Sequence, residues 1–562
     1  MLTSVAAAGK ENLRRVALMA VLTLALLLRL HGLRHLTYAG PDEGLWAYFI
    51  VNNAQLPWLS ADLASSALGR IMSWDYGWPM FVGWDAYVRL LASLGIGVNE
   101  FTLALPMVLC GVGVCYLVFL AGRRLVGEAG ALLASLLVAV MPHAVTWSRT
   151  IGGSVTFNSL LLLMAIIALM RYVEAPGQRR RQWVAGLAVG LYLCGDVQFA
   201  IGAVILLGLL ALGPRPAGYE GSRGLARLVL RPTLFVPPVV MFLPYVAAYA
   251  YACRLGYPDQ TYLGTVLAEH KARWGFHLMS FASDLWFNAG LLLMLGLTLI
   301  PRGLRQLAPE YRRWLSLWLA LTAAPFLFAM TREVTLVTCY HNHLLVAVAL
   351  LVASGVMGLR QAGLRTGLAT VLSAGTLLAT FACVYQVQPL QGVLWPRLQA
   401  PYGAMAPETG LKAAGYWVRT RLHPTDRVFV AHDPALAFWY FGRECVTGGY
   451  TAADPPPRAF LEHRNDVCAA VVTAATPYPP GIFTANGFPG LVTVRSKGKP
   501  VAWVHVREHV EEVIDAQTAA PLYNAAFRTP AQIIRPGSPY VPGRPLPGRS
   551  VPRTSSGTGP SR

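Results

Sequence analysis

Long apolar segments recur along the first 386 residues of this chain, and short arginine-rich connections separate them. One bilayer crossing needs about 20 mostly apolar residues. By that measure we expect about eleven crossings, at residues 15–32, 101–121, 129–146, 155–172, 183–195, 197–213, 232–252, 285–301, 314–330, 339–358 and 367–386. Charged residues are only 13% of the 562, too few to cover the surface of a soluble protein of this size. The sequence therefore predicts a polytopic α-helical membrane protein.

The basic residues fall on alternate connections between these segments. They are Lys10, Arg14 and Arg15, Arg123 and Arg124, Arg171 with 179–181, and the basic residues within 215–231, 302–313 and 360–365. The positive-inside rule places this side, with the N-terminus, in the cytoplasm. The outer side then holds the first external loop (33–100), the loop 253–284 and everything after about 387. Because the net charge of +19 is spread over these connections, it does not indicate nucleic-acid binding.

Residues 79–96 are apolar but contain Asp85 and Arg89. Charges in the middle of a bilayer are costly, so this stretch predicts a helix lying at the membrane interface. It is therefore not counted among the crossings, and residues 1–386 are expected to form one transmembrane unit.

After residue 387 the composition changes, and residues 387–527 predict a small extracytoplasmic α/β domain. "GLKAAGYWVRTRL" has the pattern of an amphipathic helix, and strands are expected at 427–431, in "DVCAAVVTAA" and in "VAWVHVRE". Cys445 and Cys468 would form a disulfide in an oxidising compartment, but two free thiols are an equal expectation. Residues 528–562, rich in Pro, Gly, Ser and Arg, predict a disordered tail.

Two adjacent carboxylates, Asp42 and Glu43, stand in "YAGPDEGLWAYF" just after the first apolar segment. Pro41 suits the first turn of a helix and acids favour the positive end of the helix dipole, so both fit as helix-start residues. Their location supports a second role, since Trp46 and the end of a crossing place the pair at the depth of a lipid headgroup. The residues alone leave both interpretations open.

Cationic and aromatic residues gather in three further places on the predicted outer side, in "HAVTWSRT", "AEHKARWGFH" and "TREVTLVTCYHNHLL". Outer cations oppose the positive-inside bias, and their charge-assisted hydrogen bonds suit phosphate oxygens, so they indicate an anionic partner. Arg149 also fits the commoner role of an interface anchor. The candidates are Arg149, His270, Lys271, Arg273, Arg332, Tyr340 and His341.

The sequence gives no certain cofactor, and a divalent metal stays open without support from any motif. It contains no CxxC pair, and His341 and His343 stand two residues apart, a spacing that points them to different sides of a helix. Polar lining or substrate contact is the preferred interpretation of these histidines.

The order of several motifs resembles the GT-C superfamily of membrane glycosyltransferases, in the family 39-like branch of protein O-mannosyltransferases and lipid A aminoarabinose transferases. "PDEGLWAY" resembles the acidic motif of the first external loop, and "VTWSR" resembles the Ser-Arg that ends the third crossing. "CYHNHLLVAVALLVASG" resembles a late crossing, and "AGYWVRTRLHPTDRVFVAHDPALAFWYFGRE" the small domain after the last one. The likeness runs from residue 14 to about 510. Two departures stand out: "YGWP" replaces a His-Pro-Pro or Lys-Pro-Pro sequence, and "SRTIGGSVTFNS" lacks the second acid common after Ser-Arg.

This resemblance implies transfer of a sugar, with inversion, from a polyprenyl-phosphate donor to a lipid, glycan or protein acceptor on the outer face of a bacterial cytoplasmic membrane. It implies that Asp42 is the general base and Glu43 its alternate or support. The donor phosphate would bind Arg149, Lys271, Arg273 and Arg332, with substrate contacts from Trp46, His270, Tyr340 and His341.

Two other classes of function stay open on the sequence. A transporter or flippase of lipid-linked sugars shares the hydrophobicity, although such proteins place ionisable groups near mid-membrane on broken, repeated helices. A non-catalytic scaffold of an envelope complex fits the missing second acid.

Overall fold

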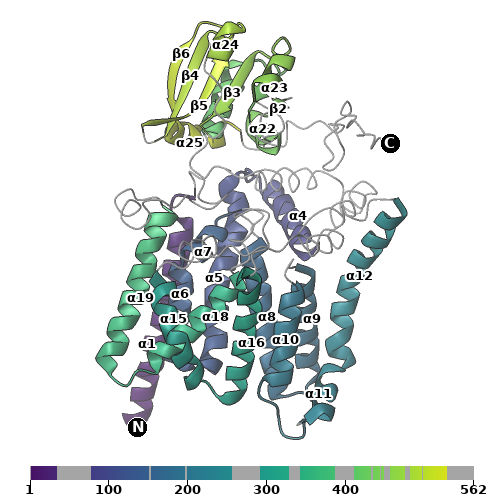
Figure 1. The fold of residues 1–562 in the computed structure, drawn as a ribbon, viewed down its shortest axis with the longest axis vertical. Helices are drawn as coiled ribbons and strands as arrows, with labels where there is room; N and C mark the ends of the chain where they lie inside the picture. Colours follow the sequence, from purple (N-terminus) through teal and green to yellow (C-terminus); the bar gives the residue numbers. More distant parts are fainter. Residues whose placement is uncertain are drawn as a thin grey trace, which may run out of the picture.

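The structure is a computed structural model of the chain. It describes residues 2–33, 78–150, 154–195, 199–219, 221–255, 291–327, 342–385, 410–431, 434–443, 445–447, 456–474, 481–496 and 498–527. Figure 1 shows a bundle of helices with a sheet domain beyond one end of it. We call this the domain end of the bundle; the N-terminal end of α1 lies at the opposite end (Figure 1).

The bundle is built mainly from apolar helices. They are α1 (Leu2–Leu30), α5 (Glu100–Leu125), α6 (Gly127–Val140), α7 (Pro142–Trp147), α8 (Ser154–Glu174), α9 (Arg179–Gly195), α10 (Phe199–Leu212), α11 (Gly221–Val229), α12 (Pro232–Leu255), α15 (Leu291–Gln306), α16 (Pro309–Leu327), α18 (Asn342–Met357) and α19 (Ala362–Cys383). Each predicted apolar segment overlaps one of these helices.

Three described helices are long and apolar enough to cross a bilayer, namely α5, α8 and α19. Helices α11 and α12 pass the same test together but are bent by 50°. The prediction of an apolar helical fold is confirmed in this coarse form. The count of about eleven crossings stays a prediction, because several of the other apolar helices are shorter.

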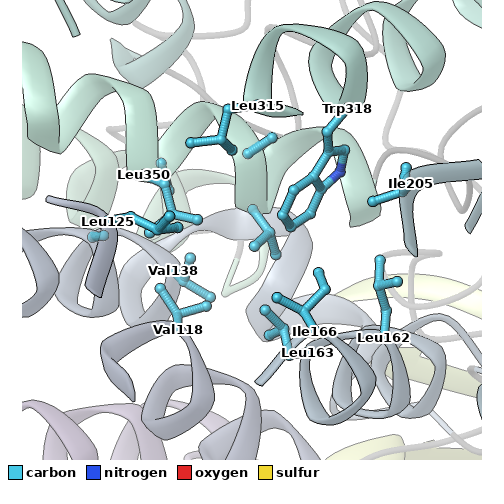
Figure 2. Close-up of a cluster of buried hydrophobic side chains, with 14 of the residues drawn as sticks. Val118, Leu125, Val138, Leu162, Leu163, Ile166, Ile205, Leu315, Trp318 and Leu350 are labelled. Carbon is cyan, nitrogen blue, oxygen red and sulfur yellow. The ribbon is translucent and has the colours of Figure 1, made fainter. Parts of the chain in front are cut away.

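Aliphatic side chains pack closely around two buried tryptophans, Trp314 and Trp318, in the core of the bundle. Trp318 lies fully buried in one cluster with Leu162 and Ile166 of α8 and Val138 of α6 (Figure 2). Its ring nitrogen donates to the carbonyl of His343 (3.1 Å). Burial of an indole is favourable only when its N–H finds an acceptor, and this condition is met.

Helix α4 (Trp78–Ser93) lies near the domain end of the bundle (Figure 1). Arg89 Nε donates to Asp85 Oδ2 at 2.9 Å, one helical turn apart, and the two side chains are 17% and 9% exposed. The Tyr87 hydroxyl donates to the carbonyl of Thr102 in α5 (2.7 Å). The sequence expectation of a helix within residues 79–96 agrees with α4, and mutual pairing explains how its two charges are buried.

The sheet domain contains six strands in the order β2-β1-β3-β5-β4-β6. Strand β1 pairs in parallel with β2 and β3, β5 runs antiparallel to β3 and β4, and β6 is parallel to β4. The strands are β1 (Val428–Val430), β2 (Cys445–Thr447), β3 (Ala469–Thr473), β4 (Gly490–Ser496), β5 (Lys499–Val506) and β6 (Glu511–Asp515). The helices are α21 (Leu411–Arg421), α22 (Pro434–Phe441), α23 (Pro456–His463), α24 (Gly481–Ala485) and α25 (Ala516–Ala526).

The two cysteines of this sheet are free thiols. Val428 of the middle strand β1 pairs with Cys445 on one side and with Ala469, the neighbour of Cys468, on the other. Two strand spacings separate the cysteines, about 10 Å. A disulfide requires Cα atoms within about 7 Å, so the sheet keeps them apart. Burial raises the pKa of the Cys468 thiol, so less of the reactive thiolate is present.

His505 in β5 makes the stability of the sheet depend on pH. Its ring stacks on Phe483 at 4.1 Å, and burial lowers the pKa of His505 to about 4. An unfolded chain binds this proton near pH 6.5. The free energy of unfolding should therefore be constant above pH 6.5 and fall as the pH drops from 6.5 to 4, by up to about 3 kcal/mol.

Hydrogen exchange of the β5 amides at several pH values measures this effect. His505→Phe should flatten the dependence, whereas His509→Gln, at an exposed position, should leave it unchanged. Equal dependence in wild type and His505→Phe would show that another group is responsible.

Candidate functional site

Two buried arginines meet at the domain end of α1. Arg29, in the last turn of α1, is 0% exposed, and its Nη1 donates to the carbonyls of Ala25 (3.0 Å) and Ala139 (3.1 Å). Its Nε and Nη2 atoms are buried and have no hydrogen-bond partner within the described part of the chain. A guanidinium has five N–H donors, so most of the donor capacity of Arg29 is unused.

Arg149 reaches the same helix end from α7. Met141 adopts an extended conformation between α6 and α7, and Pro142 starts α7, because proline lacks the N–H that would continue α6. The chain then places Arg149 with its Nη1 donating to the carbonyls of Leu28 (3.3 Å) and His31 (2.5 Å). Arg149 is 8% exposed.

Tyr385, just after α19, completes this cluster. The guanidinium of Arg149 lies 5.2 Å from the centre of the Tyr385 ring, and the Tyr385 hydroxyl donates to the carbonyl of Leu28. The His31 ring meets the Tyr385 ring edge-on at 5.1 Å. An aromatic face favours a nearby cation, so Tyr385 helps to keep Arg149 charged and in place.

Arg29 has space in this cluster because residue 111 of α5 is glycine. A Cβ atom at Gly111 would lie 2.5 Å from Arg29 Nε and 2.6 Å from the Cβ of Ser148. Gly111→Ala should therefore displace Arg29 and destabilise the protein by about 1–3 kcal/mol.

Thermal unfolding in detergent tests this expectation. The matched control is Gly113→Ala, two positions from Gly111 on the same helix, whose Cβ would meet only the end of the flexible Leu160 side chain (2.9 Å). The same loss of stability in both variants would mean that the space for Arg29 has no special importance.

A small cavity lies beside Arg29, with a free volume of about 30 Å³. Its polar lining is Arg29, His143, Thr156 and Ser159, and the other lining residues include Val114, Val138, Trp147 and Leu345. A water molecule needs roughly 10–15 Å³ in this measure. The cavity thus has room for two or three waters or one small anion, and is too small for a sugar ring.

Of the residues that the sequence predicts for the site, Arg149 is the one that the structure describes. Its anchoring contacts to α1 agree with the simpler of its two expected roles and leave the phosphate role untested. The other predicted residues lie outside the described part of the chain: Asp42, Glu43, Trp46, His270, Lys271, Arg273, Arg332, Tyr340 and His341.

Sequence reasoning missed Arg29 as a site residue and did not predict the buried contact of His343 with Tyr192. Arg29 stands alone in an apolar run, and a charge in a membrane helix is itself a signal for function. His343 is buried in α18 and its Nε2 lies 3.2 Å from the Tyr192 hydroxyl. It therefore belongs to the interior of the bundle.

This architecture is similar to that of known proteins. The family described as dolichyl-phosphate-mannose-protein mannosyltransferase matches residues 79–214. The solved structure of ArnT from Cupriavidus metallidurans in the apo state matches with a TM-score of 0.55 and 14% identity, over 90% of this chain and 99% of that one. The chain has the GT-C fold.

Two further solved structures agree with this assignment. ArnT from Cupriavidus metallidurans bound to undecaprenyl phosphate matches with a TM-score of 0.54 and 15% identity, covering 88% of this chain and 98% of that one. The oligosaccharyltransferase of Archaeoglobus fulgidus in the apo form matches with a TM-score of 0.52 and 13% identity, covering 82% and 69%. No curated protein sequence matches the chain. The resemblance drawn from the motifs is confirmed, and at these identities it concerns the fold.

Proposed function

We propose that this GT-C-fold protein is a membrane glycosyltransferase that moves a sugar from a polyprenyl-phosphate donor to an acceptor. The observation that carries the proposal is the match over nearly the full length of ArnT, one of whose structures holds undecaprenyl phosphate. The buried positive charge of Arg29 and Arg149 at the domain end of the bundle supports it, because a lipid-linked donor carries its negative charge at the membrane surface.

The reaction follows from the chemistry of such a donor. The acceptor hydroxyl oxygen bonds to the anomeric carbon while the bond from that carbon to the phosphate oxygen breaks. The phosphate leaves with the electron pair, the acceptor proton passes to a carboxylate, and the sugar is inverted. We assign the carboxylate to Asp42, with Glu43 as its support. Such a general base contributes roughly 10²–10⁴ in rate.

Positive charge placed in advance around the leaving phosphate stabilises the transition state. We assign this task to Arg149, Lys271, Arg273 and Arg332. We assign contacts with the rest of the substrate to Trp46, His270, Tyr340 and His341. These assignments rest on the motifs, together with the buried position of Arg149.

The proposed topology puts both substrates on one side of a bacterial cytoplasmic membrane. Residues 1–386 form the catalytic unit with about eleven crossings, the N-terminus is cytoplasmic, and 387–527 form the extracytoplasmic domain. The acceptor is a lipid, glycan or protein of the cell envelope. Residues 528–562 form a tail.

Turnover in lipid nanodiscs tests the proposal, because a nanodisc has no closed compartment and transport across it produces no chemical change. Purified protein should cleave a polyprenyl-phosphate sugar and release polyprenyl phosphate when an envelope extract supplies acceptors. Intact donor after incubation with hexosyl and pentosyl donors would favour the transporter or scaffold alternatives.

A further inference from the structure

We propose that the cavity beside Arg29 binds one tetrahedral oxyanion of the phosphate class. Arg29 would donate to it from Nε and Nη2. The Thr156 and Ser159 hydroxyls also line the cavity, and the Ser159 hydroxyl already donates to the carbonyl of Val155 (3.1 Å). The proposal is argued from charge, unused donors and space, so it does not depend on sugar transfer by the same protein.

The first argument is the charge balance around Arg29 and Arg149. Both guanidiniums are buried, and within the described residues Arg29 donates to backbone carbonyls of α1 and α6, whereas Arg149 donates to carbonyls of α1 and of the residue after it and also interacts with the neutral Tyr385 hydroxyl. No carboxylate forms an ion pair with either arginine in the described part of the chain. The C-terminal end of a helix carries roughly half a negative charge. Two helix ends therefore offset about one of the two positive charges, and among the described residues nothing offsets the other.

The second argument is the donor geometry. The Arg29 Nη1 atom is occupied by the carbonyls of Ala25 and Ala139, whereas Nε and Nη2 are buried without a partner in the described residues. Unsatisfied buried donors of a charged group are costly, more so than those of a neutral one. Arg29 also lines the cavity, so an anion placed there meets donors that are already desolvated and fixed.

The third argument is size. The cavity of about 30 Å³ accepts two or three waters, whose combined volume is close to that of a single phosphate group. Water alone would satisfy the N–H donors of Arg29 but would leave its positive charge without a counter-ion. An oxyanion accepts these hydrogen bonds and also balances the charge. Two of its oxygens can accept the two parallel N–H bonds that a guanidinium donates.

The binding test uses full-length protein in detergent with inorganic phosphate as the probe, at constant ionic strength. Phosphate should raise the unfolding temperature of the wild type in a saturable way. Arg29→Gln should weaken this binding about tenfold or more, since hydrogen bonds to charged groups are lost. Arg15→Gln changes an arginine on the same helix whose side chain is 73% exposed, and should bind phosphate as the wild type does.

A purely structural arginine gives a different result, in which Arg29→Gln lowers the unfolding temperature but phosphate stabilises the variant and the wild type equally. That result, or the absence of any saturable phosphate or polyprenyl phosphate effect on the wild type, overturns the proposal. If Arg29→Gln does not fold, wild-type crystals soaked in selenate decide the matter. Anomalous density between Arg29 and Thr156 supports the site, and a cavity without it overturns the site.

Polyprenyl phosphate in nanodiscs then identifies the source of the anion. If the site takes a lipid headgroup, this lipid stabilises the wild type but not Arg29→Gln, and inorganic phosphate adds nothing to its effect. If the site takes free phosphate, inorganic phosphate stabilises equally with or without the lipid. Either result supports the site, and neither requires the protein to transfer sugar.

Discussion

Asp42→Asn is expected to lower the rate of sugar transfer by about 10²–10⁴ while donor binding stays close to that of the wild type. Asparagine keeps the size and most hydrogen bonds of aspartate but cannot accept the proton of the acceptor hydroxyl. The loss should therefore appear in kcat and not in KM. Steady-state kinetics with labelled donor measures both quantities, and single-turnover kinetics confirms that the chemical step is the one slowed.

The neighbouring acid provides the comparison for this experiment. Glu43→Gln should cost less than Asp42→Asn if Glu43 supports the loop, and Glu11→Gln, on the exposed N-terminal part of α1, should cost nothing. Full transfer by Asp42→Asn would remove the general-base assignment. A larger loss in Glu43→Gln would exchange the two roles.

Lys412→Met is expected to destabilise the protein by about 3–5 kcal/mol. Lys412 Nζ in α21 lies 2.7 Å from Glu100 Oε2 in the first turn of α5, and the two side chains are 1% and 2% exposed. Removing the lysine leaves a buried carboxylate without its counter-charge. Thermal unfolding and limited proteolysis of the full chain would report the loss and a looser attachment of the sheet domain.

A second substitution separates charge from packing at this pair. The double variant Glu100→Gln and Lys412→Met should recover most of the stability, because no unpaired charge remains. Arg458→Met breaks an exposed pair with Glu462 and should change stability by less than about 1 kcal/mol. A Lys412→Met protein as stable as Arg458→Met would show that this ion pair does not hold the domain to the bundle.

The pair also explains why the sheet domain and the bundle form one structure. Trp84 of α4, Met107 of α5 and Ala414 of α21 belong to one buried apolar cluster that continues from the bundle into the domain. The ion pair lies at this junction, and Tyr523 of α25 flanks the ammonium of Lys412 at 5.6 Å. The sheet domain is therefore fixed to the bundle by both apolar and charged contacts.

Helices and strands with strong hydrophobic periodicity or a long apolar run were predictable from the sequence. Helix α5, with hydrophobic residues along most of its length, and strand β3, five buried residues of which the first four are apolar, are of this kind. Strand β6 was missed because its sequence "EEVID" is mostly charged. Exposed and half-buried residues alternate along it, and only its pairing with β4 makes it a strand.

Contacts between distant residues could not be predicted in the same way. Glu100 and Lys412 are separated by 312 positions, and nothing local in either helix names the other as its partner. Arg29 is a similar case, because only the fold brings Ala139, Gly111 and the cavity to it. Sequence motifs identified the fold, and three-dimensional packing identified the second buried arginine.

The most direct test of the account is the release of polyprenyl phosphate in sealed right-side-out vesicles that contain the wild-type protein, with the donor added to the outer leaflet. The account predicts that each sugar transferred to an outer acceptor releases one polyprenyl phosphate in the outer leaflet. Movement of intact donor to the inner leaflet, without cleavage of the bond between sugar and phosphate, would contradict it.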